Sequence, residues 1–231
     1  MITLYSYPSL FGVADNNGYG LKVFAFFRLA GLPFAQQHLF DASAAPRQQL
    51  PYIVDDGETI GDSDAIVAHA VGKYRLPIGG ALAQEQRDQD FFIGRLLDDL
   101  YWVMSYSRWQ DERYWPAFAA ALLREHPHLY EPGLLKAKEL NASRYYYQGI
   151  GRYSAPEVYA RGLADLAVLA RQVPADGYLH GREPGVVDAA VYGFIANIYF
   201  FDIDTPLKAF VVAHDNLVRH CTAIHEAVTA E

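Results

Sequence analysis

The stretch QQLPYIVDDGETIGDSDAI, residues 48–66, combines several local folding signals in a short span. Pro51 comes directly before Tyr-Ile-Val, a run that favours an extended strand. Asp56-Gly57 is a turn signal between two short strands, which predicts a β-hairpin. Asp62 and Ser63 precede an apolar segment with helical spacing, as residues at a helix start do. The stretch therefore predicts strand, turn, strand and helix, with a proline where the first of these strands begins.

Toward the N-terminus, the pattern predicts a strand, a helix and a second strand. Residues 2–7 form a short β-type run, and residues 20–32 carry apolar side chains at helical spacing up to a Gly-Leu-Pro stop signal. Residues 33–40 follow as the second strand. Such a unit implies a right-handed crossover between parallel strands. Residues 1–75 are therefore expected to form an α/β domain with a mixed sheet, built as strand, helix and strand and then hairpin and helix.

Toward the C-terminus, helical periodicity dominates. Residues 76–83, which contain Gly and Pro, are expected to be a linker. From residue 84 a long amphipathic segment carries apolar side chains four residues apart. Ser154, followed by Pro156, marks another helix start, and residues 186–201 are apolar on almost every side, as a buried central helix should be. Residues 84–231 are therefore expected to form an all-α domain.

The composition excludes several functional classes. The formal net charge is −8 and no dense Lys/Arg cluster is present, which argues against nucleic acid and anionic membranes as partners. The first residues lack the features of a signal peptide, and Asp188 and Asn197 interrupt the most apolar segment, so no membrane span is expected. The single cysteine, Cys221, excludes an intrachain disulfide and suits a reducing, cytoplasmic setting as a structural residue. The eight histidines show no metal-ligand spacing, so no metal site is expected.

Two motifs in the first domain resemble the glutathione S-transferase superfamily. Gln49-Leu50-Pro51 matches the place where a cis-proline opens the third strand of that family's thioredoxin-like domain. Asp62-Ser63 matches the acidic or amide residue and the serine that begin its third helix. The resemblance implies a thioredoxin-like N-terminal domain followed by an all-helical C-terminal domain.

The second domain and the chain's later segments carry the resemblance further. In residues 181–195, Asp188 matches the end of the family's helix cap box, although Gly185 stands where Ser or Thr is usual. Gly fits a cap position sterically but supplies no side-chain oxygen. Residues 50–66 and 206–220 look closest to the metaxin-like and failed-axon-connections-like branch of the superfamily. The resemblance therefore spans nearly the whole chain.

The resemblance implies that glutathione binds along residues 48–66. With a cis bond before Pro51, the backbone of Leu50 would pair with the cysteinyl segment of glutathione, and Gln49 would reach its glycyl end. Asp62 would accept from the γ-glutamyl ammonium, and Ser63 would bind the neighbouring carboxylate at a helix N-terminus. From the residues alone, an ordinary trans proline at an edge strand and a purely capping Asp62 remain open.

A glutathione transferase also needs a donor that stabilises the thiolate, because the thiol has a pKa of about 8.5 and the thiolate is the reactive form. On the family pattern, Asn17 takes the place of the Ser or Cys at the start of the first helix, and its amide can donate. Ser6 and Tyr7, at the end of the first strand, compete with it, and strand alternation lets only one of those two face the site. A simple turn at residues 16–18 remains open. Position 17 and Gly20 hold no cysteine, which disfavours thiol–disulfide chemistry.

The resemblance implies a cytoplasmic, homodimeric transferase that binds glutathione and conjugates its thiolate to a small hydrophobic electrophile, without a metal. Aromatic side chains that are candidates for the electrophile pocket are Tyr106, Trp109, Tyr145, Tyr146 and Tyr147, although aromatics at helical spacing are also typical of a core. The alternative is a non-catalytic binding or scaffold protein of metaxin-like type, because fold does not imply activity. The retained binding motifs favour glutathione binding, and the absent Ser or Cys at position 17 favours weak or lost catalysis.

Overall fold

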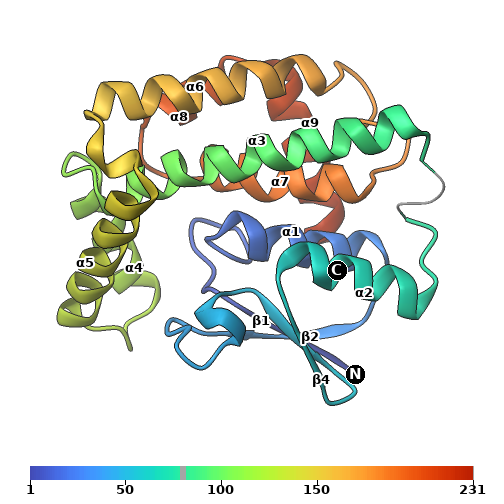
Figure 1. The fold of residues 1–231 in the computed structure, drawn as a ribbon, viewed down its shortest axis with the longest axis horizontal. Coiled ribbons are helices and arrows are strands. Elements are labelled where there is room, and N and C mark those ends of the chain that lie inside the picture. Colours follow the sequence, from blue (N-terminus) through green and yellow to red (C-terminus); the bar gives the residue numbers. More distant parts are fainter. Residues whose placement is uncertain (79–81, 231) are drawn as a thin grey trace.

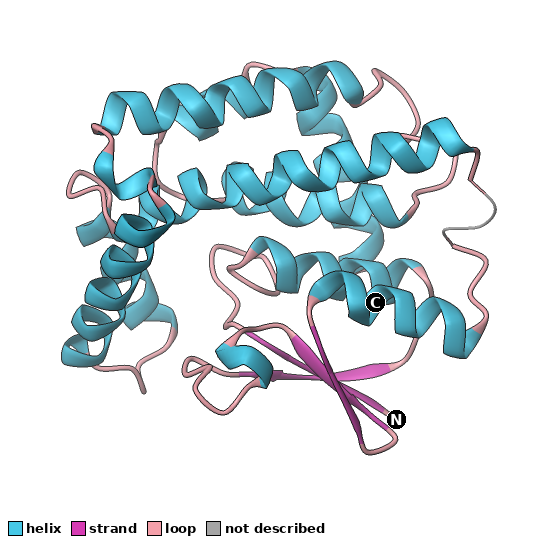
Figure 2. Cartoon of the chain, viewed as in Figure 1, coloured by secondary structure: helices cyan, strands magenta, loops and turns pink. Residues whose placement is uncertain are grey.

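The structure, a computed structural model, describes residues 1–78 and 82–230. Residues 79–81, which belong to the linker expected at 76–83, lie outside the described residues. A sheet at one side of the molecule is followed by two helices and then by a larger layer of helices (Figures 1 and 2). The chain therefore has the expected order, an α/β part followed by an all-helical part.

The sheet has the strand order β2-β1-β3-β4. Its strands are β1 (Ile2–Ser6), β2 (Phe34–His38), β3 (Tyr52–Asp55) and β4 (Glu58–Gly61). β1 is parallel to β2 and antiparallel to β3, so the sheet is mixed as predicted. The β3–β4 hairpin turns at Asp56 and Gly57, whose φ angles of 52° and 87° suit the two-residue turn of a right-twisted hairpin.

The helices occupy the rest of the chain. They are α1 (Gly18–Leu29), α2 (Ser63–Tyr74), α3 (Gln84–Trp109), α4 (Trp115–Glu125), α5 (Glu131–Gln148), α6 (Ala155–Gln172), α7 (Val186–Tyr199), α8 (Pro206–Val212) and α9 (Asp215–Thr229), with short 3₁₀ turns η1 (Pro46–Gln48) and η2 (Ile150–Arg152). Helices α1 and α2 lie between the sheet and the α3–α7 layer, and α4 and α5 form one end of the molecule (Figure 1).

Helix α1 begins and ends earlier than the apolar spacing of residues 20–32 predicts. Gly31 has a φ of 65°, and its N–H donates to the carbonyl of Arg28 while the N–H of Leu32 donates to that of Phe27. This pair of bonds is a Schellman motif, which ends a helix at the residue before the glycine. The apolar Leu32 therefore packs on the core from outside the helix.

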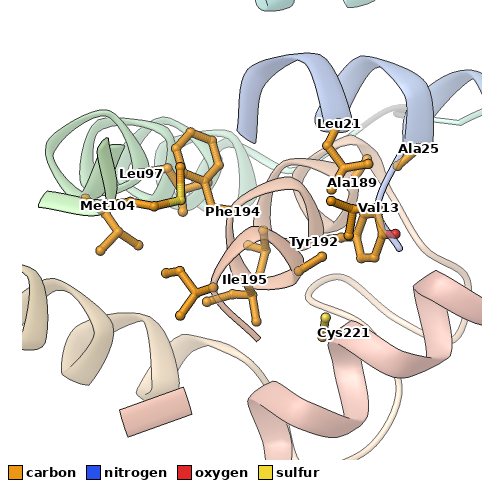
Figure 3. Packing of buried hydrophobic residues seen from close by; sticks show 14 of the residues in the cluster. Val13, Leu21, Ala25, Leu97, Met104, Ala189, Tyr192, Phe194, Ile195 and Cys221 are labelled. Atoms are coloured by element: carbon orange, nitrogen blue, oxygen red, sulfur yellow. The ribbon is translucent and has the colours of Figure 1, made fainter. Parts of the chain in front are cut away.

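The central helix α7 packs directly against α1, at a distance set by glycine. A Cβ on Gly193 would lie 2.4 Å from the carbonyl oxygen of Gly18 and 2.8 Å from the backbone nitrogen of Lys22, so only glycine fits at this crossing. Figure 3 shows Phe194 and Tyr192 of α7 among the core side chains between α1, α3 and α9. The buried Cys221 lies in the same core, where burial raises the pKa of its thiol.

The start of α7 is fixed by Asp188, as the cap motif predicted. Its carboxylate accepts from the backbone N–H groups of Gly185 (2.8 Å) and Leu179 (3.0 Å) and lies 2.8 Å from Nε2 of His220. The aspartate thus caps the helix although Gly185 has no side-chain oxygen. Among the described helices, none is both long and apolar enough to cross a membrane.

Candidate active site in the cleft between the sheet and the helices

A cleft of about 680 Å³ lies where the N-terminal ends of α1 and α2 face α3 and α5. Pockets of this size are large enough for a small organic ligand. Predicted site residues from four separate segments line it: Tyr7, Asn17, Gln49, Leu50, Pro51, Asp62 and Ser63. Of the residues predicted for glutathione binding and thiol activation, Ser6 alone is not among the lining residues. The fold therefore brings together residues that are far apart in the chain.

The loop before β3 forms one wall of the cleft. The Leu50–Pro51 bond is cis, as the family resemblance implied, and the alternative of an ordinary trans proline is wrong. Pairing between β1 and β3 begins at Tyr52, so the Leu50 peptide lies just outside the described ladder. The backbone of Leu50 is therefore placed at the cleft, next to the sheet.

The start of α2 forms the neighbouring wall. One carboxylate oxygen of Asp62 accepts from the N–H groups of Asp64 (3.0 Å) and Ala65 (3.2 Å), so Asp62 is a helix cap. Ser63 is buried, and its hydroxyl lies 3.4 Å from the ammonium of Lys22, which also pairs with Asp64. Sequence reasoning missed Lys22; the only signal was a lone lysine in the apolar segment that forms α1. The lysine adds positive charge beneath the N-terminus of α2.

Asn17 caps α1 at the edge of the cleft. Its Oδ1 accepts from the N–H of Tyr19 at 3.0 Å, which uses the acceptor end of the amide. Within the described residues, its Nδ2 group donates to no protein atom. Asn17 therefore offers the cleft a hydrogen-bond donor next to a helix N-terminus, where an anion is stabilised.

Tyr7 and Ser6 lie on opposite sides of the backbone, as strand alternation requires. Tyr7 lines the cleft, and burial raises the pKa of its phenol to about 12, so it is a neutral donor at ordinary pH. Ser6 is fully buried, and its Oγ accepts from Nε2 of Gln36 at 2.8 Å. The geometry disfavours Ser6 as a thiol partner, because its hydroxyl is buried outside the cleft lining and is hydrogen-bonded to Gln36.

Asp15 fixes the backbone of Tyr7 relative to the backbone of Asn17. Its carboxylate accepts from the N–H of Asn17 (2.7 Å) and from that of Tyr7 (3.2 Å). Asp15 is fully buried, and burial raises the pKa of its carboxyl well above the usual value. A Cβ on Gly20 would lie 1.7 Å from Oδ2 of Asp15, which explains the glycine at that position. Sequence reasoning missed Asp15, since a single acid in a loop gives no signal of burial.

A second network of buried hydrogen bonds links residues 15–16, in the loop before α1, to helices α3 and α7. Arg108 of α3 donates to the carbonyl of Asn16 (2.5 Å) and to that of Asn197 (2.5 Å), and Nδ2 of Asn197 donates to the carbonyl of Asp15 (3.1 Å). Burial lowers the pKa of Arg108 to about 10, so the guanidinium remains charged at neutral pH. The position of Asn17 thus depends on contacts with α3 and α7.

The wall opposite the sheet comes from α3 and α5. Trp102, Ser105 and Tyr145 line it, and the hydroxyls of Ser105 and Tyr145 lie 2.7 Å apart. Of the aromatic residues predicted for the electrophile pocket, only Tyr145 lies there. The rest do not line the cleft: Tyr146 and Tyr147 are exposed, Tyr106 is buried in the core, and Trp109 packs on Trp115 and Phe118. Consecutive residues of a helix point in different directions, so a run of three tyrosines cannot share one wall.

The acidic side chains that line the cleft are Asp62, Asp64 and Asp98. Within residues 1–78 and 82–230, no group of three or more His, Cys, Asp or Glu side chains is arranged to hold a metal ion. Among these acids, Asp62 caps α2 through one of its carboxylate oxygens, Asp64 pairs with Lys22, and Asp98 contacts Tyr19 (2.8 Å) and Arg95 (3.1 Å).

Known proteins that are similar to this chain include two curated relatives and a solved structure. An isoprene-epoxide glutathione S-transferase of Rhodococcus sp. (strain AD45) is 28% identical over 206 residues, which are 86% of this chain and 87% of that protein. The Failed axon connections protein of Drosophila melanogaster is 26% identical; the match covers 98% of this chain but 57% of that longer protein. The glutathione S-transferase CsGST63524 of Ceriporiopsis subvermispora, solved in complex with glutathione, superposes with a TM-score of 0.61 at 16% identity, covering 100% of this chain and 98% of that one.

Family models match both parts of the chain. The model of the glutathione S-transferase N-terminal domain matches residues 19–114, and that of the glutathione S-transferase C-terminal domain matches residues 162–224. The match to Failed axon connections hints at the branch suggested by residues 50–66 and 206–220, which stays a prediction. With both domain models in their expected order, and with the same order of sheet and helices, the chain belongs to the glutathione S-transferase superfamily.

Proposed function

We propose that the protein binds glutathione in the cleft and conjugates its thiolate to a carbon atom of a small hydrophobic electrophile. The observation that carries this proposal is the convergence of Leu50, Ser63, Asn17 and Tyr7 on one cleft. The backbone at Leu50 is placed to pair with an extended peptide, and Ser63 stands at a helix N-terminus, which favours a carboxylate. Asn17 and Tyr7 then flank the position of the thiol.

Two neutral donors would stabilise the thiolate. The free Nδ2 group of Asn17 and the phenol of Tyr7 are hydrogen-bond donors, and the N-terminus of α1 adds its dipole. A hydrogen bond to an anion is about twice as strong as one between neutral groups, so these donors lower the thiol pKa. Attack then forms the carbon–sulfur bond while the bond from that carbon to its leaving group or ring oxygen breaks. A leaving group departs with its electron pair, and an opened epoxide oxygen takes a proton from solvent.

The choice of a small electrophile is supported by the relative named for an isoprene epoxide, which matches most of both chains. Retention on immobilised glutathione, followed by calorimetry with free glutathione, tests binding. We expect the Ser63→Ala variant to lose about 1–3 kcal/mol of the free energy of glutathione binding, the usual cost of removing a hydrogen bond to a charged group. Absence of any retention would remove glutathione from the proposal.

A second candidate is a binding protein on the same fold without turnover. It is favoured by Asn17 in place of Ser or Cys and by the match to Failed axon connections. Glutathione would then bind without any lowering of its thiol pKa. Ultraviolet titration of the bound thiolate separates the two candidates.

A further inference from the structure

The helical wall of the cleft carries a guanidinium without an acidic partner. Arg144 of α5 is exposed and lines the cleft. Among the described residues it forms none of the ion pairs, whereas the neighbouring Arg95 pairs with Asp98 at 3.1 Å and Lys22 pairs with Asp64. A free arginine at a cleft is notable in a chain with a formal net charge of −8.

The charge of Arg144 acts on the part of the cleft where the thiol would lie. Burial raises the pKa of Tyr7 to about 12 and also raises the pKa of Tyr145, and in both phenols the positive charge of Arg144 opposes the rise. Arg144 lines the same cleft as Tyr7 and directly precedes Tyr145 in α5. In the proposed function Tyr7 flanks the thiol, which places Arg144 beside the space left for the electrophile.

The same wall is more polar than a hydrophobic electrophile needs. Asn141, Ser105 and Tyr145 present amide and hydroxyl groups, and Trp102 supplies an aromatic face. The hydroxyls of Ser105 and Tyr145 bond to each other, but a purely apolar ligand would take the amide of Asn141 and the guanidinium of Arg144 out of water without replacing their hydrogen bonds. A planar carboxylate matches the paired N–H groups of a guanidinium, and an unsaturated or aromatic body can pack on the indole.

We propose that the electrophile accepted by this protein carries a carboxylate, which Arg144 binds from the helical wall while the body of the molecule packs on Trp102. This inference rests on the proposed transferase function and narrows its substrate class from small hydrophobic electrophiles to organic acids. The reaction balances as before: with a chlorodinitrobenzoate, glutathione thiolate forms the carbon–sulfur bond, and chloride leaves with the electron pair of the broken carbon–chlorine bond. The carboxylate is unchanged and stays on Arg144.

Binding of the finished product tests the inference without requiring turnover. Two conjugates of glutathione are prepared chemically, one from chlorodinitrobenzoate and one from its methyl ester, and their affinities are measured by calorimetry. In the Arg144→Gln variant, the acid conjugate is expected to bind about tenfold more weakly and the ester to change by less than about twofold, since only the acid loses a charge-assisted bond. Arg144→Lys should recover part of the affinity.

The matched control is Arg171→Gln, which removes one exposed arginine of α6 outside the cleft and should leave both affinities unchanged. Equal losses for acid and ester in Arg144→Gln, or no loss for either, would overturn the inference while leaving glutathione binding intact. If the native protein binds neither conjugate nor glutathione, the proposed function fails and the inference fails with it. Relative kcat/KM for the two chlorinated compounds, each divided by its uncatalysed rate, provides the second readout.

Discussion

At the scale of single residues, Asn17 joins a structural role to a chemical one. Its Oδ1 caps α1, and its Nδ2 group faces the cleft. Removal of the side chain is therefore expected to cost the cap, about 1 kcal/mol, and also the donor that we propose for the thiolate. A variant that keeps the cap but not the donor is needed to separate these effects, and aspartate provides it because its carboxylate can still accept from Tyr19.

We expect Asn17→Asp to raise the pKa of bound glutathione by at least about one unit, because a donor is replaced by a like charge, and one unit corresponds to about 1.4 kcal/mol. Asn17→Ser, which retains an acceptor for the cap and an O–H donor, should restore a low pKa. The measurement is the ultraviolet absorbance of bound thiolate as a function of pH. Identical curves for the native protein and both variants would exclude Asn17 and leave Tyr7 as the donor.

At the scale of elements, the α1–α7 crossing determines where the start of α1 lies. Gly193 permits contact between backbones, so Gly193→Ala would place a methyl group 2.4 Å from a carbonyl oxygen that cannot move alone. We expect a loss of about 1–3 kcal/mol in the free energy of unfolding, together with weaker glutathione binding, because α1 carries Asn17. Urea unfolding and calorimetry measure the two effects.

The control for that crossing is Gly94→Ala in α3, where a Cβ would meet no atom within 4 Å. There alanine should stabilise the helix by about 0.5–1 kcal/mol, since only the backbone entropy of glycine is lost. Similar destabilisation at both positions would show that the close contact at Gly193 is not what limits substitution.

The α3–α6 contact carries a pH dependence through Asp165. Burial, together with the nearby Asp99, raises the pKa of this carboxyl to about 6, and its Oδ2 is buried without a partner within the described structure, although Arg161 opposes the shift. A raised pKa means that the folded state holds the proton more tightly than the unfolded state. Stability attributable to Asp165 is therefore present below pH 3.8, falls as the pH rises toward about 6, and is absent above it.

Replacement of Asp165 by asparagine should remove this penalty. After allowance for solvent screening of a half-exposed group, we expect Asp165→Asn to gain about 1 kcal/mol at neutral pH and nothing at acidic pH. Denaturant unfolding at both ends of this range is the measurement. A gain that is equal at all pH values would assign the effect to packing instead of charge.

At the scale of the whole molecule, the expected homodimer is a prediction that involves α3. Phe91 and Phe92 of this helix are 69% and 48% exposed, and neighbouring exposed aromatic side chains are typical of a contact surface. Light scattering should give twice the chain mass of 25.9 kDa, and Phe91→Glu should lower it toward the single-chain value. Tyr147→Glu, at a 79% exposed position of α5, serves as the control. A single-chain mass for the native protein at micromolar concentration would contradict the prediction.

Local sequence patterns determined the elements on which the site is built. Asp56-Gly57 determined the hairpin because few residue pairs adopt positive φ at both positions. Asp62 and Asp188 marked helix starts because their carboxylates accept from N–H groups two or three residues away. These interactions join residues that are close in the sequence, so the local sequence pattern is enough to predict them. The family resemblance added the cis bond before Pro51, which no local pattern required.

Only the tertiary structure decided which polar residues act at the cleft. Asp15 is buried because α3 and α7 close over its loop through Arg108 and Asn197, and Arg144 lines the cleft because α5 forms part of its helical wall. The choice between Ser6 and Tyr7 likewise depended on which side of β1 the helices cover. Burial and long-range electrostatics are sums over residues distant in the chain, so the pattern around one residue does not contain them. The sequence by itself therefore determined the fold and the motifs that we propose to bind glutathione, whereas packing decided the charges that surround them.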